Sequence, residues 1–316
     1  LHAAGITKMQ QLAELSASQL PSVAKAAGLV QKTLEKIWLQ AKLQHKSKTT
    51  KKPASKLLLT AKKTLQHLPP DSTGDLFLDL EGFPSYSHAL NYLIGICCRD
   101  GQYLPWWAHT LEDEQKNFEA VLDYILQRRR QYPEMHVYCY GHYEATAFRH
   151  TAERSSSEYQ EKTEEFINHI LVDLHPFVKG CLALGLPGYG LKQVEKMYKN
   201  VRKTAIAVAL DSVLVYQKWS EKPDGYADNS EYLRQILEYN KDDCRSAMEL
   251  LHWLRKRCAK VDVVYVPKPP AQKKGKTPSR QSETAGMSKA FEDFKKFVDE
   301  RCAQEECLRC KAQTLP

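Results

Sequence analysis

The segment DLFLDLEG, at residues 75–82, constrains the fold of this chain more than any other stretch. Its leucines and phenylalanine belong in a protein interior and predict a strand, whereas its two acids, Asp79 and Glu81, do not belong there. Asp79 and Glu81 lie two positions apart, so in a strand they project from the same face. Because an unpaired buried charge is costly, carboxylates in such a place are usually paired or bind a metal ion. Acids at a strand end can also be ordinary surface residues, and the pair alone leaves both interpretations open.

The order of apolar patterns predicts an α/β fold in which a mixed sheet is flanked by helices. We expect the strands first, interrupted by one amphipathic helix, and then a mostly helical remainder. The expected strands are 75–82, 90–101, 102–109 and 135–141. The expected helices are 111–132, 143–154, 156–185, 191–200 and 229–259.

Composition divides the chain into four parts. Residues 1–44 have apolar residues at helical spacing and resemble helix-hairpin-helix modules, although a small helical packing module without a nucleic-acid role is an equal alternative. Residues 45–74 are polar and basic at the start and rich in turn residues at the end, and we expect a linker there, in which LLLTAKKTLQHL (57–68) could form one helix. Residues 75–267 form the α/β domain, and residues 268–316 are expected to be a disordered linker followed by a short helix.

Charge is concentrated at the N-terminal end. The whole chain carries a net charge of +8, whereas the residues up to Pro70 hold twelve lysines and two glutamates, a net charge of +10. A basic end on a near-neutral body suggests a polyanionic partner, most simply nucleic acid. A lysine-rich solubilising arm is the alternative. The lysines expected to contact nucleic acid here are Lys46, Lys48, Lys51 and Lys52.

The remaining composition predicts a reduced, cytoplasmic protein. The sequence has no apolar stretch long enough to span a membrane and no visible signal peptide. Nine cysteines are scattered through the chain, which argues against a disulfide scaffold. Near the end, Cys302, Cys307 and Cys310 could contribute to a metal site, but a fourth ligand is not evident. Since the first residue is Leu1 rather than Met, we expect the N-terminus to be cut from a longer chain. A helicase or nuclease domain in that longer chain is a candidate partner.

Further acids stand at positions that suit a metal site. Glu144 follows the fourth expected strand at the start of a helix, where the helix dipole also accommodates an acid without any catalytic role. Tyr239 and Asp243 are four positions apart, so they are neighbours on one helical face, whereas Asp242 projects elsewhere. Asp173 follows another apolar run.

Three motifs in this order, DLEG, YGHYE and YNKDDC, resemble those of the DEDD exonucleases, in the tyrosine-bearing subclass that includes the proofreading domains of DNA polymerases. The segments VDLHPFVKG and GYGLKQVEKMY are also similar to that group. The closest likeness is to the RNase H-like domain of predicted RecB-type nucleases, and it covers roughly residues 75–260. The second motif ends in Glu144, where the proofreading group has Asp and the RecB-type branch has Glu.

This resemblance implies an RNase H-like fold and a 3′–5′ exonuclease that acts on single-stranded DNA or RNA ends. It implies two Mg²⁺ or Mn²⁺ ions about 3.5–4 Å apart, bound by carboxylates. The implied catalytic residues and metal ligands are Asp79, which bridges both ions, Glu81 and Asp243 at one ion, and Glu144, which holds the other indirectly. Tyr239 would orient the attacking water, and Asp173 would support the metal ligands without binding the metal itself. His142 could hydrogen-bond the substrate, although an ordinary turn histidine is an equal alternative. Lys192 is a fifth lysine that we expect to contact nucleic acid.

Two other classes of function stay open. One is a non-catalytic nucleic-acid-binding module of a larger repair, helicase or mobile-element protein, and the other is a structural adaptor, which predicts no dependence on metal. Transposases and recombinases also use RNase H-like acids, but the Tyr-x-x-x-Asp spacing at the end favours the exonuclease group. The sequence does not distinguish DNA from RNA as the substrate.

Overall fold

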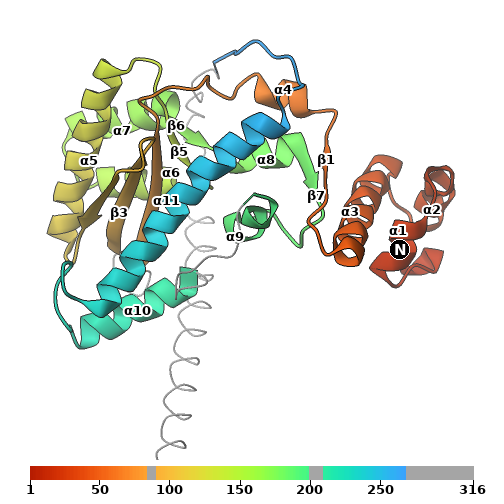
Figure 1. Ribbon diagram of the computed structural model, residues 1–316, viewed down its shortest axis with the longest axis horizontal. Coiled ribbons are helices and arrows are strands. Elements are labelled where there is room, and N and C mark those ends of the chain that lie inside the picture. Colours follow the sequence, from red (N-terminus) through yellow and green to blue (C-terminus); the bar gives the residue numbers. More distant parts are fainter. Residues whose placement is uncertain (84–89, 199–208, 268–316) are drawn as a thin grey trace, which may run out of the picture.

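The computed structural model describes residues 1–83, 90–198 and 209–267. A five-stranded mixed sheet, in the order β4–β3–β2–β5–β6, forms the centre of the α/β domain (Figure 1). Its strands are β2 (Leu76–Phe83), β3 (Leu90–Cys98), β4 (Tyr103–Trp107), β5 (Val137–Cys139) and β6 (Leu171–Asp173). Strand β2 pairs antiparallel with β3 and parallel with β5, so the predicted α/β fold with a mixed sheet is confirmed.

Helices cover both faces of this sheet, and β2 is buried between them. Leu76 and Leu78 pack in one core with α5 and α6, whereas Phe77 packs in a second core with α8 and α11. Figure 1 shows α11 running across the sheet, with α10 beside its N-terminal part. The helices of the domain are α5 (Leu111–Gln131), α6 (Tyr143–Ala152), α7 (Ser157–Glu165), η3 (Phe166–Ile170), α8 (His175–Cys181), α9 (Leu191–Val194), η4 (Glu195–Met197), α10 (Ala209–Glu221) and α11 (Glu231–Arg257).

The segment 156–185, predicted to be helical throughout, also contains two strands. Strand β6 pairs parallel with β5, and β7 (Leu182–Leu184) forms a separate two-stranded sheet with β1 (Ser55–Leu57). Each of these strands has three residues, which is too short to display the alternation by which a strand is recognised in sequence. The difference matters because Asp173 ends a sheet strand rather than lying inside a helix.

The N-terminal helices have their own small core. Leu12, Leu20 and Leu34 are buried together, and the indole Nε1 of Trp38 donates a hydrogen bond to the Leu15 carbonyl oxygen at 2.9 Å. The elements are η1 (His2–Ala4), α1 (Met9–Glu14), η2 (Ala17–Gln19), α2 (Leu20–Ala26) and α3 (Gln31–Thr50). The helical pattern predicted for residues 1–44 is therefore present.

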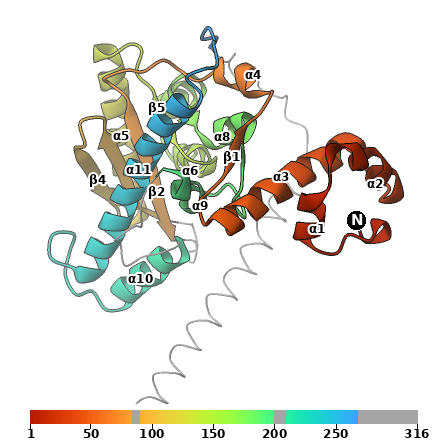
Figure 2. The ribbon, with the colours of Figure 1, turned by 45° about the vertical axis from the view of Figure 1, so that its right-hand side comes forward.

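The segment 45–74 differs from the expected linker. Helix α3 continues past residue 44 to Thr50, and β1 pairs with β7. The helix expected within residues 57–68 is present as α4 (Ala61–Leu65), which packs against α8. The side-chain amide of Gln40 donates to the Leu184 carbonyl oxygen at 2.6 Å, and that of Gln44 donates to the Leu186 carbonyl oxygen at 2.8 Å. Figure 2 shows α3 extending from the N-terminal helices toward the α/β domain. The prediction for residues 268–316, with its three clustered cysteines, lies outside the described residues.

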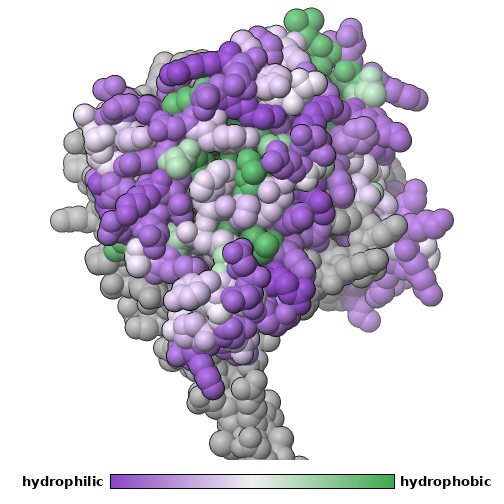
Figure 3. Space-filling model, turned by 60° about the vertical axis from the view of Figure 1, so that its left-hand side comes forward, coloured by the Kyte–Doolittle hydropathy of each residue, from purple (hydrophilic) through white to green (hydrophobic). Residues whose placement is uncertain are grey.

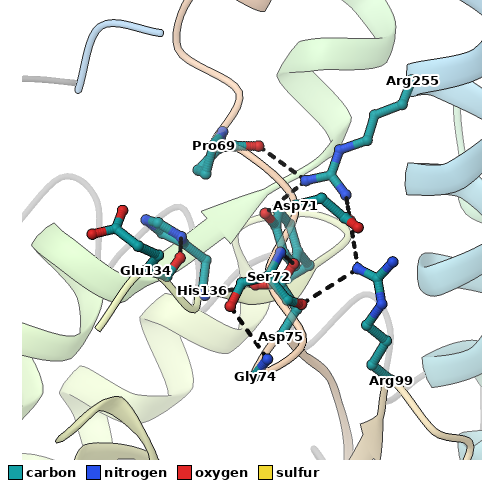
Figure 4. A network of polar contacts seen from close by, with 10 residues as sticks. Pro69, Asp71, Ser72, Gly74, Asp75, Arg99, Glu134, His136 and Arg255 are labelled. Carbon is teal, nitrogen blue, oxygen red and sulfur yellow. Dashed lines mark hydrogen bonds and ion pairs between the residues drawn. The ribbon is translucent and has the colours of Figure 1, made fainter. Parts of the chain in front are cut away.

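A polar network fixes the point at which the chain enters β2 (Figure 4). Asp71 forms ion pairs with both Arg99 and Arg255. The carboxylate of Asp75 is fully buried and accepts the backbone N–H groups of Ser72 and His136, at 3.1 and 2.9 Å. Burial raises the pKa of Asp75. This network secures the start of β2, at the opposite end of the strand from Glu81.

Hydrophilic side chains cover most of the described part of the face shown in Figure 3, and hydrophobic ones form small separate groups. Within residues 1–83, 90–198 and 209–267, no helix has the length and apolar character that a membrane span requires.

Candidate metal centre

Strand β2 directs Asp79 and Glu81 toward α10 and α11. Both share the strand face of Phe77, which packs in the core that contains α11, while Leu78 and Leu80 face the opposite core. Asp79 is half-buried and Glu81 is buried. A continuous apolar strand can therefore hold two acids because they occupy the end of only one face.

Helix α11 supplies the third acid. Tyr239 and Asp243 lie one turn apart, and both are buried against the sheet. One carboxylate oxygen from each of Asp79, Glu81 and Asp243 lies within 4.8 Å of the other two. The three acids come from a strand and a helix that are far apart in the chain, and they form a group that could hold a metal ion.

Asn240 orients Asp79, and it was not among the predicted site residues. Its side-chain amide donates to Asp79 Oδ2 at 2.9 Å and to the Asp79 carbonyl oxygen at 3.1 Å. The hydroxyl of Tyr103 donates to Asn240 Oδ1 at 2.7 Å, which fixes the direction of the amide. A Cβ atom at Gly95, on the neighbouring strand β3, would collide with Asn240 Oδ1, so a glycine is needed for this close approach. The only sequence signal is the position of Asn240 directly after Tyr239.

Ser212 supports Glu81 in a similar way. Its hydroxyl donates to Glu81 Oε2 at 2.7 Å, and the Tyr92 hydroxyl lies 3.3 Å from the same serine oxygen. Ser212 is buried in the first turns of α10. It belongs to no motif, so no sequence signal could have identified it.

Glu144 lies near the three acids but is not one of the group that could share an ion. It is buried in the first turn of α6, and its Oε2 atom has no hydrogen-bond partner among the described residues. Burial raises the pKa of Glu144 to about 7, and the charge of Asp173 acts in the same direction. A buried carboxylate oxygen without a donor is a position at which a cation or a bound water would be stabilised.

Asp173 and His142 have different surroundings. Asp173 Oδ1 accepts the backbone N–H groups of Gly141 and His175, both at 2.8 Å, and so ties the end of β6 to the turn that precedes α6. This contact places the helix start that carries Glu144. His142 is the residue before α6 and is exposed.

The pKa values of Asp79 and Glu81 are both raised, and the charge of Asp243 contributes to each shift. Burial, followed by the charge of Asp243, raises the pKa of Glu81 to about 8. Burial and the charges of Asp243 and Glu81 raise the pKa of Asp79 well above its usual range. These raised pKa values mean that the positive charge near the carboxylates is too small to stabilise all of them in the ionised form. A divalent cation would supply the missing charge.

Of the five lysines predicted to contact nucleic acid, Lys192 is the one that lies at this centre. Its ammonium group forms an ion pair with Asp243 and lies 4.0 Å from the centroid of the Tyr239 ring. The other four predicted contacts are exposed at or just after the C-terminal end of α3. They are Lys46, Lys48, Lys51 and Lys52.

The comparison with protein families gives one match. A model of the RNase H superfamily matches residues 76–255, which is more than half of the chain. The match begins at β2 and ends within α11, so it contains all three acids of the group. Comparisons with curated proteins and with solved structures give no match.

Proposed function

Because the chain belongs to the RNase H superfamily, we propose that it is a metal-dependent nuclease that hydrolyses phosphodiester bonds in DNA or RNA. The observation that carries this proposal is the convergence of Asp79, Glu81 and Asp243 within 4.8 Å at the end of β2. More specifically, we propose a 3′–5′ exonuclease of the tyrosine-bearing DEDD type, similar to the RNase H-like domains of RecB-type nucleases. The spacing of Tyr239 and Asp243 on α11 supports this subclass.

The side chains at the centre fit Mg²⁺ or Mn²⁺. Both ions prefer oxygen ligands, and the group offers only carboxylate oxygens. Asp79, Glu81 and Asp243 would hold one ion, and Asp79 with Glu144 would hold a second one indirectly. The unpartnered Oε2 atom of Glu144 supports a role for this residue in holding that ion or its water. Two ions, when bound, would increase the acidity of a bound water and stabilise negative charge on the phosphoryl oxygens.

The protein side chains would align the reactants. The Asn240 amide keeps the Asp79 carboxylate in one orientation, and Ser212 does the same for Glu81. The Tyr239 hydroxyl would orient the attacking water, because its ring is fixed one turn from Asp243. Asp173 would act by holding the turn before α6, and the exposed His142 would contact the nucleic acid.

The N-terminal helices would bind the nucleic-acid strand. Exposed lysines at and after the end of α3 form a basic surface, and the residues up to Pro70 carry a net charge of +10. Such a surface binds phosphate groups without sequence preference. A single strand with a free end suits the exonuclease proposal, and a helicase or second nuclease domain in a longer chain would supply such ends.

The test is an assay with oligonucleotides that are labelled at the 5′ or the 3′ end. The expected result is stepwise shortening from the 3′ end with Mg²⁺ or Mn²⁺ and none with EDTA. Asp79→Asn and Asp243→Asn should abolish cleavage, whereas the matched control Asp242→Asn, at the adjacent position of α11, should retain it. Normal cleavage by Asp79→Asn would refute the assignment of the catalytic centre to the acids around Asp79. Binding without any cleavage would favour the non-catalytic nucleic-acid-binding module instead.

A further inference from the structure

Lys192 places a positive charge inside the group of acids. Its ammonium group forms an ion pair with Asp243 Oδ1, and the side chains of Lys192 and Asp243 are only 28% and 9% exposed. The same ammonium group lies over the ring of Tyr239. The lysine therefore contacts both residues of α11 that the proposed reaction uses.

The backbone that carries Lys192 is held in place. Helix α9 begins after Gly190, and the preceding Tyr189 bonds through its hydroxyl to the Leu182 carbonyl oxygen at 3.1 Å and through its own carbonyl oxygen to the Tyr140 hydroxyl. The Leu186 carbonyl oxygen, a few residues earlier, accepts the Gln44 amide of α3. These hydrogen bonds at Leu186 and Tyr189 fix the segment that leads into α9, and they therefore help to fix the position of Lys192.

An ammonium group and a divalent cation compete for the same carboxylate, that of Asp243. Asp243 Oδ1 is bonded to Lys192, and a carboxylate oxygen of Asp243 also belongs to the group that could hold a metal ion. Once a metal ion has taken the charge of Asp243, the partly buried ammonium group is released from this carboxylate and can bind an incoming anion. In a nuclease, the anion that arrives next is the phosphate of the substrate.

We propose that Lys192 is a built-in counter-cation of the metal-free centre, which gives up Asp243 to the metal ion and then binds the phosphodiester of the substrate. This inference rests on the proposed function, since it requires a metal ion and a phosphodiester at the same centre. It assigns one side chain two successive partners, first Asp243 and then the phosphate.

The first test compares the full chain with Lys192→Met, which keeps the aliphatic stem over Tyr239 and removes the charge. Without substrate, the variant should bind Mn²⁺ about tenfold more tightly, measured by electron paramagnetic resonance of the free ion, because its competitor is gone. With substrate, its turnover should fall about tenfold or more, because the variant has no ammonium group to bind the phosphate. A role limited to stability would not move metal affinity and turnover in these opposite directions. The matched control is Lys196→Met, an exposed lysine one turn further on, which should change neither.

The second test needs no variant. Lysines of the wild-type protein are methylated reductively, and the modified positions are mapped by mass spectrometry. Lys192 should react slowly in EDTA, several-fold faster with Mg²⁺, and slowly again when a hydrolysis-resistant phosphorothioate oligonucleotide is added, while Lys196 should not respond to the metal.

Two results would overturn the inference while leaving the proposed function intact. They are unchanged or weaker Mn²⁺ binding by Lys192→Met in a protein that cleaves, and unchanged labelling of Lys192 when Mg²⁺ binds. Tighter Mn²⁺ binding by Lys192→Met, with labelling of Lys192 that rises on adding Mg²⁺ in a protein that never cleaves, would support the exchange at Asp243 and refute the nuclease. A protein that binds no metal would overturn both proposals.

Discussion

The burial of Glu81 beside Asp243 predicts that the metal-free protein becomes less stable as the pH rises. Burial and the charge of Asp243 raise the pKa of Glu81 from 4.5 to about 8. Between these two values, the folded protein keeps a proton on Glu81 that the unfolded chain has already released. The folded state therefore binds more protons, and the free energy of unfolding must fall as pH increases through this window.

The size of this effect follows from the same two values. A rise in pKa from 4.5 to about 8, at about 1.36 kcal/mol per pH unit, corresponds to on the order of 5 kcal/mol once Glu81 is fully ionised. The whole stability of a domain is typically about 5–15 kcal/mol. Without metal, this one carboxylate should thus remove a large part of the stability between pH 5.5 and 8.5.

The assay is urea unfolding in EDTA at pH 5.5, 7.0 and 8.5, for the wild type and for Glu81→Gln. The variant should be the more stable protein at pH 8.5, and its advantage over the wild type should be smaller by about 3 kcal/mol at pH 5.5, near the lower end of this window. Other groups titrate as well: the pKa of His136 is lowered to about 4 by burial, which makes stability rise with pH between about 4 and 6.5. The difference between the two proteins cancels that contribution.

Metal provides the second arm of this experiment. Mn²⁺ should restore stability to the wild type at pH 8.5, because it binds the ionised acids of the folded state only, and it should restore less to Glu81→Gln. An identical pH dependence for the two proteins in EDTA would refute the placement of Glu81 in a buried acidic group whose charge Lys192 offsets only in part.

Further predictions concern the orientation of the side chains at the metal centre and the binding of nucleic acid by the exposed lysines. Tyr239→Phe should lower turnover ten- to a thousandfold and leave Mn²⁺ affinity nearly unchanged, since it removes one hydrogen bond to the water, and single-turnover kinetics would measure this. Gly95→Ala should destabilise the protein by about 1–3 kcal/mol in urea unfolding and weaken Mn²⁺ binding, because the new methyl group displaces Asn240 from Asp79. Replacing three exposed lysines by Gln should flatten the log–log salt dependence of single-strand binding by roughly 0.7 for each phosphate group that is no longer neutralised, with the circular dichroism spectrum unchanged. These lysines are Lys46, Lys48 and Lys52.

The sequence predicted the parts of the centre that depend on local periodicity. Residues two apart in a strand share a face, and residues four apart in a helix share a face, so Asp79 with Glu81 and Tyr239 with Asp243 could be paired without a structure. Each pair is found on one face as expected. The long amphipathic helix α5 was also predicted, because its apolar residues recur over many turns.

The parts that were missed depend on contacts between distant segments. Nothing in the neighbourhood of Ser212 reveals that Glu81 needs a donor, since the two residues are 131 positions apart. The three-residue strand β1 looks like a polar connection until its partner β7 is known. Lys192 was expected to contact nucleic acid, and only the structure shows that it contacts Asp243.

The pairing of β1 with β7 also bears on how the chain folds during its synthesis. Ser55 pairs with Leu184, which is 129 positions later in the chain. At a synthesis rate of about 5–20 residues per second, β1 waits roughly ten seconds for its partner strand. During this interval its backbone is an open edge that another chain could extend, and the adjacent lysines, Lys51, Lys52 and Lys56, are residues of the kind that discourage such pairing. We therefore expect the positive charge in this region to discourage such pairing in a newly made chain, a role separate from the nucleic-acid binding proposed above.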